Sequence, residues 1–215
     1  MKKENILTKD EILEVIDELE IMHPDAACEL NYKNNYELIV SVILSAQTTD
    51  VSVNKVTPKL FEIYPDAYAL SVAKNEDIEE LIKNIGLYRS KSKNIIDMAK
   101  SLVNEFDGQV PNDFKNLVGL RGVGPKTANV VLAEAFNVPA IAVDTHVFRV
   151  SNRIGIVDES DVAHTEKSLK KQIPMQKWIR AHHLLIFHGR RICTARNPKC
   201  ELCKIKLLCR FYNEV

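Results

Sequence analysis

The amino-acid sequence predicts an all-α protein, and three observations point to this fold class. Apolar residues recur at helical spacing along most of the chain. No stretch shows the sustained apolar–polar alternation that is typical of a strand. Glycine accounts for only 7 of the 215 residues, against a usual share of about 7%, so the chain has few turns that need this residue.

The first third of the chain is expected to form helices. Thr8, followed three residues later by Glu11, is typical of a capping box at a helix start. The apolar face of that helix comprises Ile12, Ile16 and Leu19. Residues 36–46 are apolar on nearly every side, and their length favours a central buried helix over a strand. Asp50 is predicted to cap a helix that ends before Tyr64.

A helix-hairpin-helix motif is predicted at about residues 114–133. Two helices at 75–85 and 92–106, joined through Gly86-Leu87-Tyr88, precede it. A short helix over 114–120 then runs into Arg121-Gly122-Val123-Gly124, and Pro125 follows at the first helical position, which tolerates proline. A helix, a tight glycine turn and a second helix define the motif.

Another helix is expected at residues 145–154, capped by Asp144. Its apolar stripe consists of Val143, Val147, Val150 and Ile154, while a separate polar face carries His146, Arg149 and Arg153. The breaking sequence Asn137-Val138-Pro139 before this helix marks a plausible domain boundary.

Four of the five cysteines lie within seventeen positions: Cys193, Cys200, Cys203 and Cys209. A disulfide network is a poor interpretation for a chain without a secretory signal. Four closely spaced thiolates suit a tetrahedral zinc ion or a 4Fe–4S cluster, and the spacing leaves both open. Cys28 stands apart and is expected to be a buried structural thiol.

The composition excludes several classes of protein. With 46% hydrophobic and 27% charged residues, the chain is neither disordered nor of low complexity. No apolar run approaches the roughly 18 residues of a membrane span, and the first residues lack the apolar core of a signal peptide. We therefore expect a soluble intracellular protein.

The formal net charge of zero conceals an uneven distribution of charge. Residues 1–30 hold three lysines and nine acidic residues, whereas residues 166–210 hold twelve basic and two acidic residues. Arg89, Lys91 and Lys93 add a small basic cluster. We interpret the zero as an acidic face that cancels a basic one, and the basic face can neutralise DNA phosphates.

The hairpin also carries a candidate nucleophile. A Gly-x-Gly turn before a helix presents backbone N–H groups that favour a phosphate. Lys126 follows at the positive end of the helix dipole, which disfavours its charged form, and a neutral amine can form a Schiff base. A carboxylate such as Asp144 could stabilise positive charge beside it. The plainer interpretations are a solvated surface lysine and a simple helix cap.

Five segments of the chain, taken together, resemble the endonuclease III family. They are LSAQTTDVSVNKVT (44–57), GLYRSKSKNI (86–95), LRGVGPKTANVVL (120–132), AVDTHVFRVSNR (142–153) and HGRRICTARNPKCELCKIKLLC (188–209). Members of this family are base-excision-repair DNA glycosylases and abasic-site lyases of the helix-hairpin-helix superfamily. The resemblance runs in order from about residue 10 to about residue 210.

The resemblance implies a two-domain all-α fold. A six-helix domain over 23–133 would carry the hairpin, a discontinuous domain of 1–22 and 134–215 would hold a 4Fe–4S cluster, and DNA would lie across the cleft between them. Cluster ligands would be Cys193, Cys200, Cys203 and Cys209. Lys126 matches the family's nucleophile and Asp144 its catalytic carboxylate. Residues matching DNA-contacting positions are Gln47, Leu87, Gly122, Gly124 and His146.

The implied activity is removal of oxidised pyrimidines from duplex DNA through a lysine Schiff base and β-elimination. The resemblance also implies a monomer that is cytoplasmic and associated with the nucleoid. Alternatives are a related adenine–mismatch glycosylase, which generally lacks the lysine, a non-enzymatic zinc DNA-binding protein, and an electron carrier. In one departure, the family's Leu-Pro-Gly-Val-Gly-Arg/Lys-Lys reads Leu-Arg-Gly-Val-Gly-Pro-Lys here (120–126).

Overall fold

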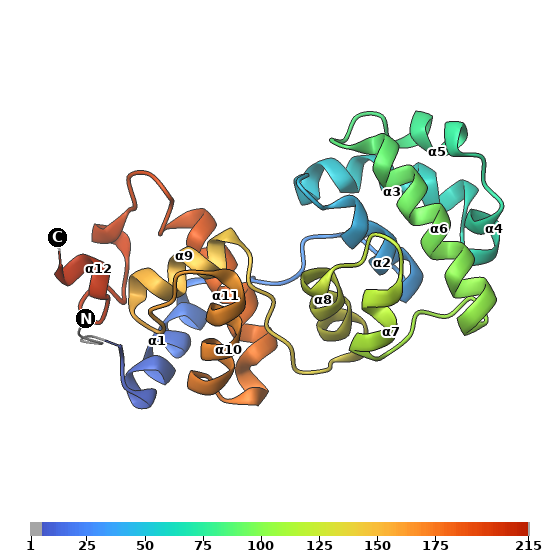
Figure 1. Ribbon diagram of the computed structural model, residues 1–215. Coiled ribbons are helices and arrows are strands. Elements are labelled where there is room, and N and C mark those ends of the chain that lie inside the picture. The colour runs from blue at the N-terminus through green and yellow to red at the C-terminus, as the bar shows by residue number, and fades with distance from the viewer. Residues whose placement is uncertain (1–5, 215) are drawn as a thin grey trace. The chain divides into compact units, whose positions relative to one another are not determined.

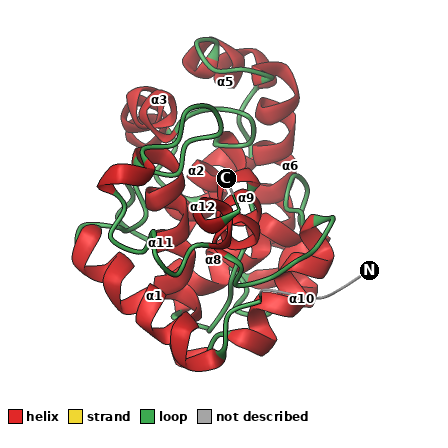
Figure 2. Ribbon diagram, turned by 90° about the vertical axis from the view of Figure 1, so that its left-hand side faces the viewer, coloured by secondary structure: helices red, strands yellow, loops and turns green. Residues whose placement is uncertain are grey.

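The computed structural model describes residues 6–214, and these residues form helices joined by loops (Figures 1 and 2). No strand occurs among them, which confirms the all-α prediction. None of the helices in this range is both long enough and apolar enough to cross a membrane.

The chain divides by its internal contacts into two compact units. We call Glu29–Val138 the central unit, and Met1–Cys28 together with Pro139–Val215 the terminal unit. The sequence had placed the domain boundaries at 22/23 and 133/134. Each unit is described below by itself.

The central unit is built around α2, which is buried from Tyr36 to Leu44. α2 packs against α3, α6 and α8, as expected for a helix that is apolar on all sides. The helices of this unit are α2 (Asn35–Leu44), α3 (Asp50–Ile63), α4 (Ala67–Ser71), α5 (Asn75–Ile82), α6 (Tyr88–Phe106), α7 (Phe114–Gly119) and α8 (Pro125–Phe136).

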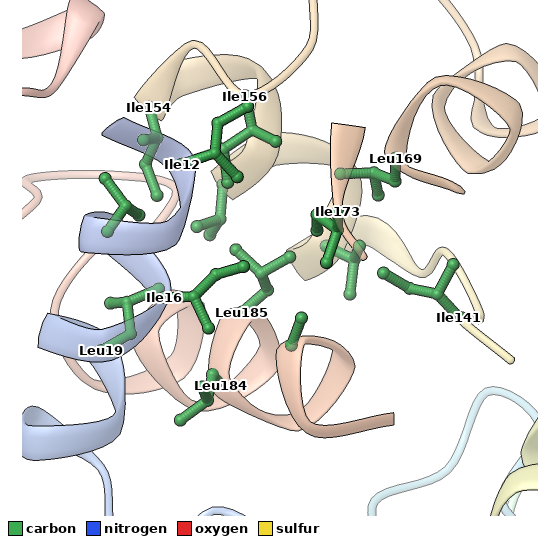
Figure 3. Packing of buried hydrophobic residues seen from close by; sticks show 14 of the residues in the cluster. Ile12, Ile16, Leu19, Ile141, Ile154, Ile156, Leu169, Ile173, Leu184 and Leu185 are labelled. Carbon is green, nitrogen blue, oxygen red and sulfur yellow. The ribbon is translucent and has the colours of Figure 1, made fainter. Parts of the chain in front are cut away.

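The terminal unit has its own hydrophobic core. Ile12, Ile16 and Leu19 of α1 lie in it with Leu184 and Leu185 of α11 (Figure 3). α9 contributes the predicted apolar stripe, since all four of its members are buried. The elements are α1 (Lys9–Met22), α9 (Thr145–Ile154), α10 (Val162–Gln172), the 3₁₀ helix η1 (Met175–Lys177), α11 (Trp178–Arg191), the 3₁₀ helix η2 (Cys200–Leu202) and α12 (Arg210–Asn213).

Helix starts follow local capping chemistry, with two corrections to the predictions. The Thr8–Glu11 capping box is confirmed. The cap of α3 is Thr49 rather than Asp50, because the Thr49 hydroxyl accepts the N–H of Ser52 at 3.3 Å and its backbone is extended. α6 begins at residue 88 instead of 92, directly after a left-handed residue.

A third correction concerns Cys28, which is partly exposed rather than buried. It lies in the segment that follows α1, at the end of the terminal unit, where the chain passes to the central unit. A residue at a junction between two units has fewer neighbours than a residue in the hydrophobic core of a unit.

Candidate active site and cysteine cavity

The turn between α7 and α8 presents an uncapped helix N-terminus. Gly122 has φ +81°, and a Cβ there would lie 2.9 Å from Cβ of Asn94, so this position needs glycine. Gly124 is the N-cap of α8 and supplies no side-chain cap, and nothing lies within 4 Å of where its Cβ would be. Pro125 occupies the first helical position as predicted. The turn therefore leaves backbone donors open to an anion.

Lys126 is the second residue of α8 and its side chain is exposed. Among residues 6–214, no hydrogen bond or ion pair engages its amine. A nucleophilic amine must be reachable and unpaired, and both conditions hold here. The central unit thus places an accessible amine two residues after the glycine turn.

The structure brings Gln47 and Leu87 to adjacent loops of the central unit. Both residues have left-handed backbones, with φ of 53° and 59°, which is unusual for non-glycine residues. A Cβ on Gly86 would lie 3.8 Å from both the Gln47 carbonyl oxygen and Oγ1 of Thr48, so the two loops are in contact. Leu87 is 57% exposed, and its side chain is available to a partner.

A buried lysine joins these two loops. Lys91, in the first turn of α6, is only 3% exposed and donates to Oγ1 of Thr48 at 2.7 Å. Burial lowers its pKa below the usual range for lysine. The sequence grouped Lys91 with Arg89 and Lys93 in a small basic cluster and did not predict this buried role. The signal was available, because Lys91 lies four residues before the buried Ile95 on one face of α6.

Asp144 is the N-cap of α9, as predicted. Its Oδ1 accepts the backbone N–H groups of His146 and Val147, each at 2.8 Å. His146 is half-buried, and its Nδ1 accepts from Arg149 at 3.2 Å. Burial lowers the pKa of His146, while the Asp144 carboxylate opposes that shift. Asp144 and His146 are therefore fixed at one helix end in the terminal unit.

The polar face of α9 holds the cysteine loop. Arg149 donates to the carbonyl oxygens of Cys193, at 3.1 Å from Nη2, and Gly189, at 3.0 Å. Arg153 donates to the carbonyls of Thr194 at 2.8 Å and of Ala195 at 3.0 Å. The sequence predicted the face but not its partner. These arginines connect the helix capped by Asp144 to the loop that begins at Cys193.

Four cysteines line one small cavity of the terminal unit, with a volume of about 20 Å³. They are Cys193, Cys200, Cys203 and Cys209, and none forms a disulfide. Within residues 6–214, no three His, Cys, Asp or Glu side chains converge closely enough to hold a single metal ion. Four thiols that line one cavity are the donor set that an iron–sulfur cluster takes.

The environment of the cavity disfavours bare thiolates. Burial raises the pKa of Cys203 to about 11 and raises that of Cys209 as well. Nε2 of His188 lies 3.6 Å from Sγ of Cys203, and its other nitrogen, Nδ1, lies 3.1 Å from Nε2 of His23. The desolvating surroundings lower the pKa of His188 to about 3. Neither histidine was predicted from the sequence, because the two are 165 residues apart in the chain.

The charge distribution predicted an acidic face opposed to a basic one, and the structure contradicts this in the terminal unit, where the two segments contact each other. Three ion pairs join the α1 segment to η1 and α11: Asp17–Lys177, Glu20–Arg180 and Asp25–Arg191. Part of the cancelling charge is therefore neutralised locally. The exposed cations of the cysteine loop with no ion pair among the described residues are Arg196, Lys199 and Lys204.

Residues 40–175 match the family model of the HhH-GPD superfamily of base excision DNA repair proteins. The chain is 50% identical to endonuclease III of Rickettsia felis, covering 89% of this chain and 90% of the relative. It is 44% identical to endonuclease III of Escherichia coli K12, covering 97% and 99%. The chain belongs to this superfamily and, within it, to the endonuclease III family.

Solved structures agree with this assignment. A trapped endonuclease III–DNA covalent intermediate is 47% identical, with a TM-score of 0.91 over 97% of this chain and 98% of that one. A thermostable thymine-DNA glycosylase is 27% identical, with a TM-score of 0.85 over 96% and 98%. Lys126 lies in the central unit and Asp144 in the terminal unit. Their meeting around a substrate stays a prediction.

Proposed function

We propose that this protein is a bifunctional DNA glycosylase and abasic-site lyase that removes oxidised pyrimidines from duplex DNA. One observation carries the proposal: an exposed, unpaired Lys126 follows a glycine turn at an uncapped helix N-terminus. Membership of the endonuclease III family supports the same activity.

DNA binding begins at the hairpin. The backbone N–H groups around Gly122 and Gly124 bind a phosphate, because the helix dipole and the missing side-chain cap both favour an anion there. Gln47 and Leu87 enter the space that the damaged nucleotide leaves when it flips out of the stack. His146 contacts the DNA from the terminal unit. The protein acts as a monomer.

Catalysis uses Lys126 and Asp144. The Lys126 amine attacks C1′ of the sugar, the glycosidic bond breaks and the damaged base leaves. Asp144 stabilises the positive charge that develops on the sugar. The amine nitrogen then loses a proton and the C1′–O4′ bond of the sugar ring breaks, which turns the adduct into a Schiff base. The Schiff base acidifies the C2′ proton, and loss of that proton expels the 3′ phosphate by β-elimination. The base therefore leaves as the covalent intermediate forms, and the strand break follows from that intermediate.

Cys193, Cys200, Cys203 and Cys209 would hold a 4Fe–4S cluster. When bound, it would cross-link the loop that Arg149 and Arg153 hold against α9. The exposed Arg196, Lys199 and Lys204 of that loop are available to DNA phosphates.

Borohydride trapping tests the assignment of the nucleophile. Wild-type protein incubated with duplex containing thymine glycol or dihydrouracil should give a covalent adduct on reduction, and Lys126→Gln should give none. Lys115→Gln, which removes an exposed lysine of α7, is the matched control and should trap normally. Undiminished trapping by Lys126→Gln would sink the assignment. Excision of mismatched adenine instead of oxidised pyrimidines would indicate the related adenine–mismatch activity.

A further inference from the structure

Two buried histidines form a chain that ends on a cysteine of the cavity. His23 is the C-cap of α1 and is 2% exposed, and His188 lies in the last turn of α11 and is 1% exposed. Their rings lie 5.4 Å apart between centroids, with Nε2 of His23 at 3.1 Å from Nδ1 of His188. The far nitrogen of His188, Nε2, lies 3.6 Å from Sγ of Cys203. The chain of contacts thus runs from His23 through His188 to the sulfur.

Only one arrangement of protons satisfies this chain when Cys203 is a cluster ligand. A ligating cysteine is a thiolate and has no proton to donate. Each neutral imidazole carries a single N–H. If His188 carried it on Nδ1, its Nε2 lone pair would face the negative sulfur, which is repulsive. With the proton on Nε2, His188 donates to the sulfur and its Nδ1 accepts from Nε2–H of His23.

The remaining nitrogen of His23 agrees with this arrangement. Nδ1 of His23 is buried and has no hydrogen-bond partner within residues 6–214. In the arrangement above, the proton of His23 is on Nε2, so Nδ1 carries only a lone pair. The arrangement therefore leaves one acceptor without a donor, but no N–H without an acceptor. The one unsatisfied acceptor of this hydrogen-bond chain therefore lies on His23, while the sulfur of Cys203 receives a hydrogen bond.

We infer that His188 donates a hydrogen bond to the Cys203 sulfur of the cluster and that His23, which does not line the cavity, holds His188 in the donating tautomer. Both are positioning residues, and the inference rests on the proposed 4Fe–4S cluster. A hydrogen bond to a ligand sulfur draws electron density away from the cluster, which stabilises its reduced state. Partners behind a metal ligand also fix its orientation and retain the metal.

The reduction potential of the cluster in DNA-free holoprotein tests this inference, with iron content and the rate of iron loss to a chelator measured alongside. His188→Leu should shift the potential to more negative values and speed cluster loss by about 10- to 100-fold. His23→Leu should shift the potential in the same direction by a smaller amount. His23→Gln, whose amide N–H replaces the imidazole Nε2–H, should restore it.

His182→Leu is the matched control. His182 is buried on the same helix, its Nδ1–H donates to the Ala142 carbonyl at 2.8 Å, and it does not line the cysteine cavity. This variant should lose thermal stability and keep the wild-type potential. A wild-type potential in both His23→Leu and His188→Leu, or an equal shift in His182→Leu, would overturn the inference.

Failure of the proposed function gives a different result. Purified wild type that contains zinc and no iron contradicts the cluster and this inference together, whereas absence of borohydride trapping in an iron-loaded protein contradicts the catalytic proposal alone.

Discussion

Two lysines of the central unit illustrate how position decides the use of one side chain. Lys126 is exposed and unpaired beside the glycine turn, where an amine can reach a substrate. Lys91 is buried and donates to Thr48, where an amine can only hold structure. Sequence alone indicated the first from its neighbouring glycines and misassigned the second, because burial of a lysine is rare and depends on contacts distant in the chain.

The hairpin turn gives a prediction at the scale of one residue. Gly122→Ala should destabilise the protein by about 1–3 kcal/mol, because alanine is strained at φ +81° and its Cβ would meet Asn94 at 2.9 Å. Gly119→Ala, in the same hairpin, is the control: no described atom lies within 4 Å of its added Cβ and its φ is not positive, so it should raise stability by about 0.4–1 kcal/mol. Urea unfolding of both variants measures the difference. Equal midpoints would contradict the strain argument.

For the helices, the capping residues could be predicted from the sequence, but the contacts between residues distant in the chain could not. The Thr8–Glu11 box and the Asp144 cap are local chemistry, and the structure has both. The start of α6 depends on Leu87 at φ 59°, a conformation that a leucine adopts only when surrounding contacts hold it. The histidine chain joins α1 to α11 across 165 residues, and no spacing rule connects such positions.

The link between the Gln47 and Leu87 loops gives a prediction for a pair of elements. Lys91→Met removes the donor to Thr48 but keeps the length of the side chain. The two loops should then be less well positioned, and excision of a damaged base under single-turnover conditions should slow by about 10- to 100-fold.

Lys93→Met is the matched control for this change. It removes the same charge from an exposed position two residues further along α6, so any loss of general electrostatic attraction is equal in the two variants. Excision by Lys93→Met should stay close to wild type. An equal loss in both variants would show that charge, and not loop position, explains the effect.

Across the whole molecule, the net charge of zero includes acidic and basic residues that pair with each other in the terminal unit. Glu20 of α1 and Asp25 beyond its end form ion pairs with α11 that neutralise part of the charge, while the cysteine loop keeps exposed cations. The formal net charge, summed over the sequence, counts the paired charges and the exposed cations alike. Their different surroundings predict different responses to pH and to salt.

Acid should weaken the carboxylate side of these ion pairs. Arg191 lowers the pKa of Asp25 to about 2, and Arg180 lowers that of Glu20. Because the folded-state pKa values lie below the unfolded ones, the stabilisation is fully present above about pH 5 and is lost as pH falls toward 2. The urea midpoint of wild type should exceed that of Asp25→Asn/Glu20→Gln at pH 7, and the gap should narrow below pH 4. A gap independent of pH would contradict this assignment.

Salt should distinguish the free cations of the cysteine loop from the paired ones. Lys199 and Lys204 are exposed and make no ion pair among the described residues, whereas Lys206 pairs with Glu201 at 2.8 Å. Each phosphate contact contributes about 0.9 to the slope of log K against log salt concentration. Lys199→Gln/Lys204→Gln should therefore weaken binding to a duplex and flatten that slope by about 2, while Lys206→Gln leaves the slope near wild type. Fluorescence anisotropy across a salt series measures all three proteins, and identical slopes would place the DNA backbone away from this loop.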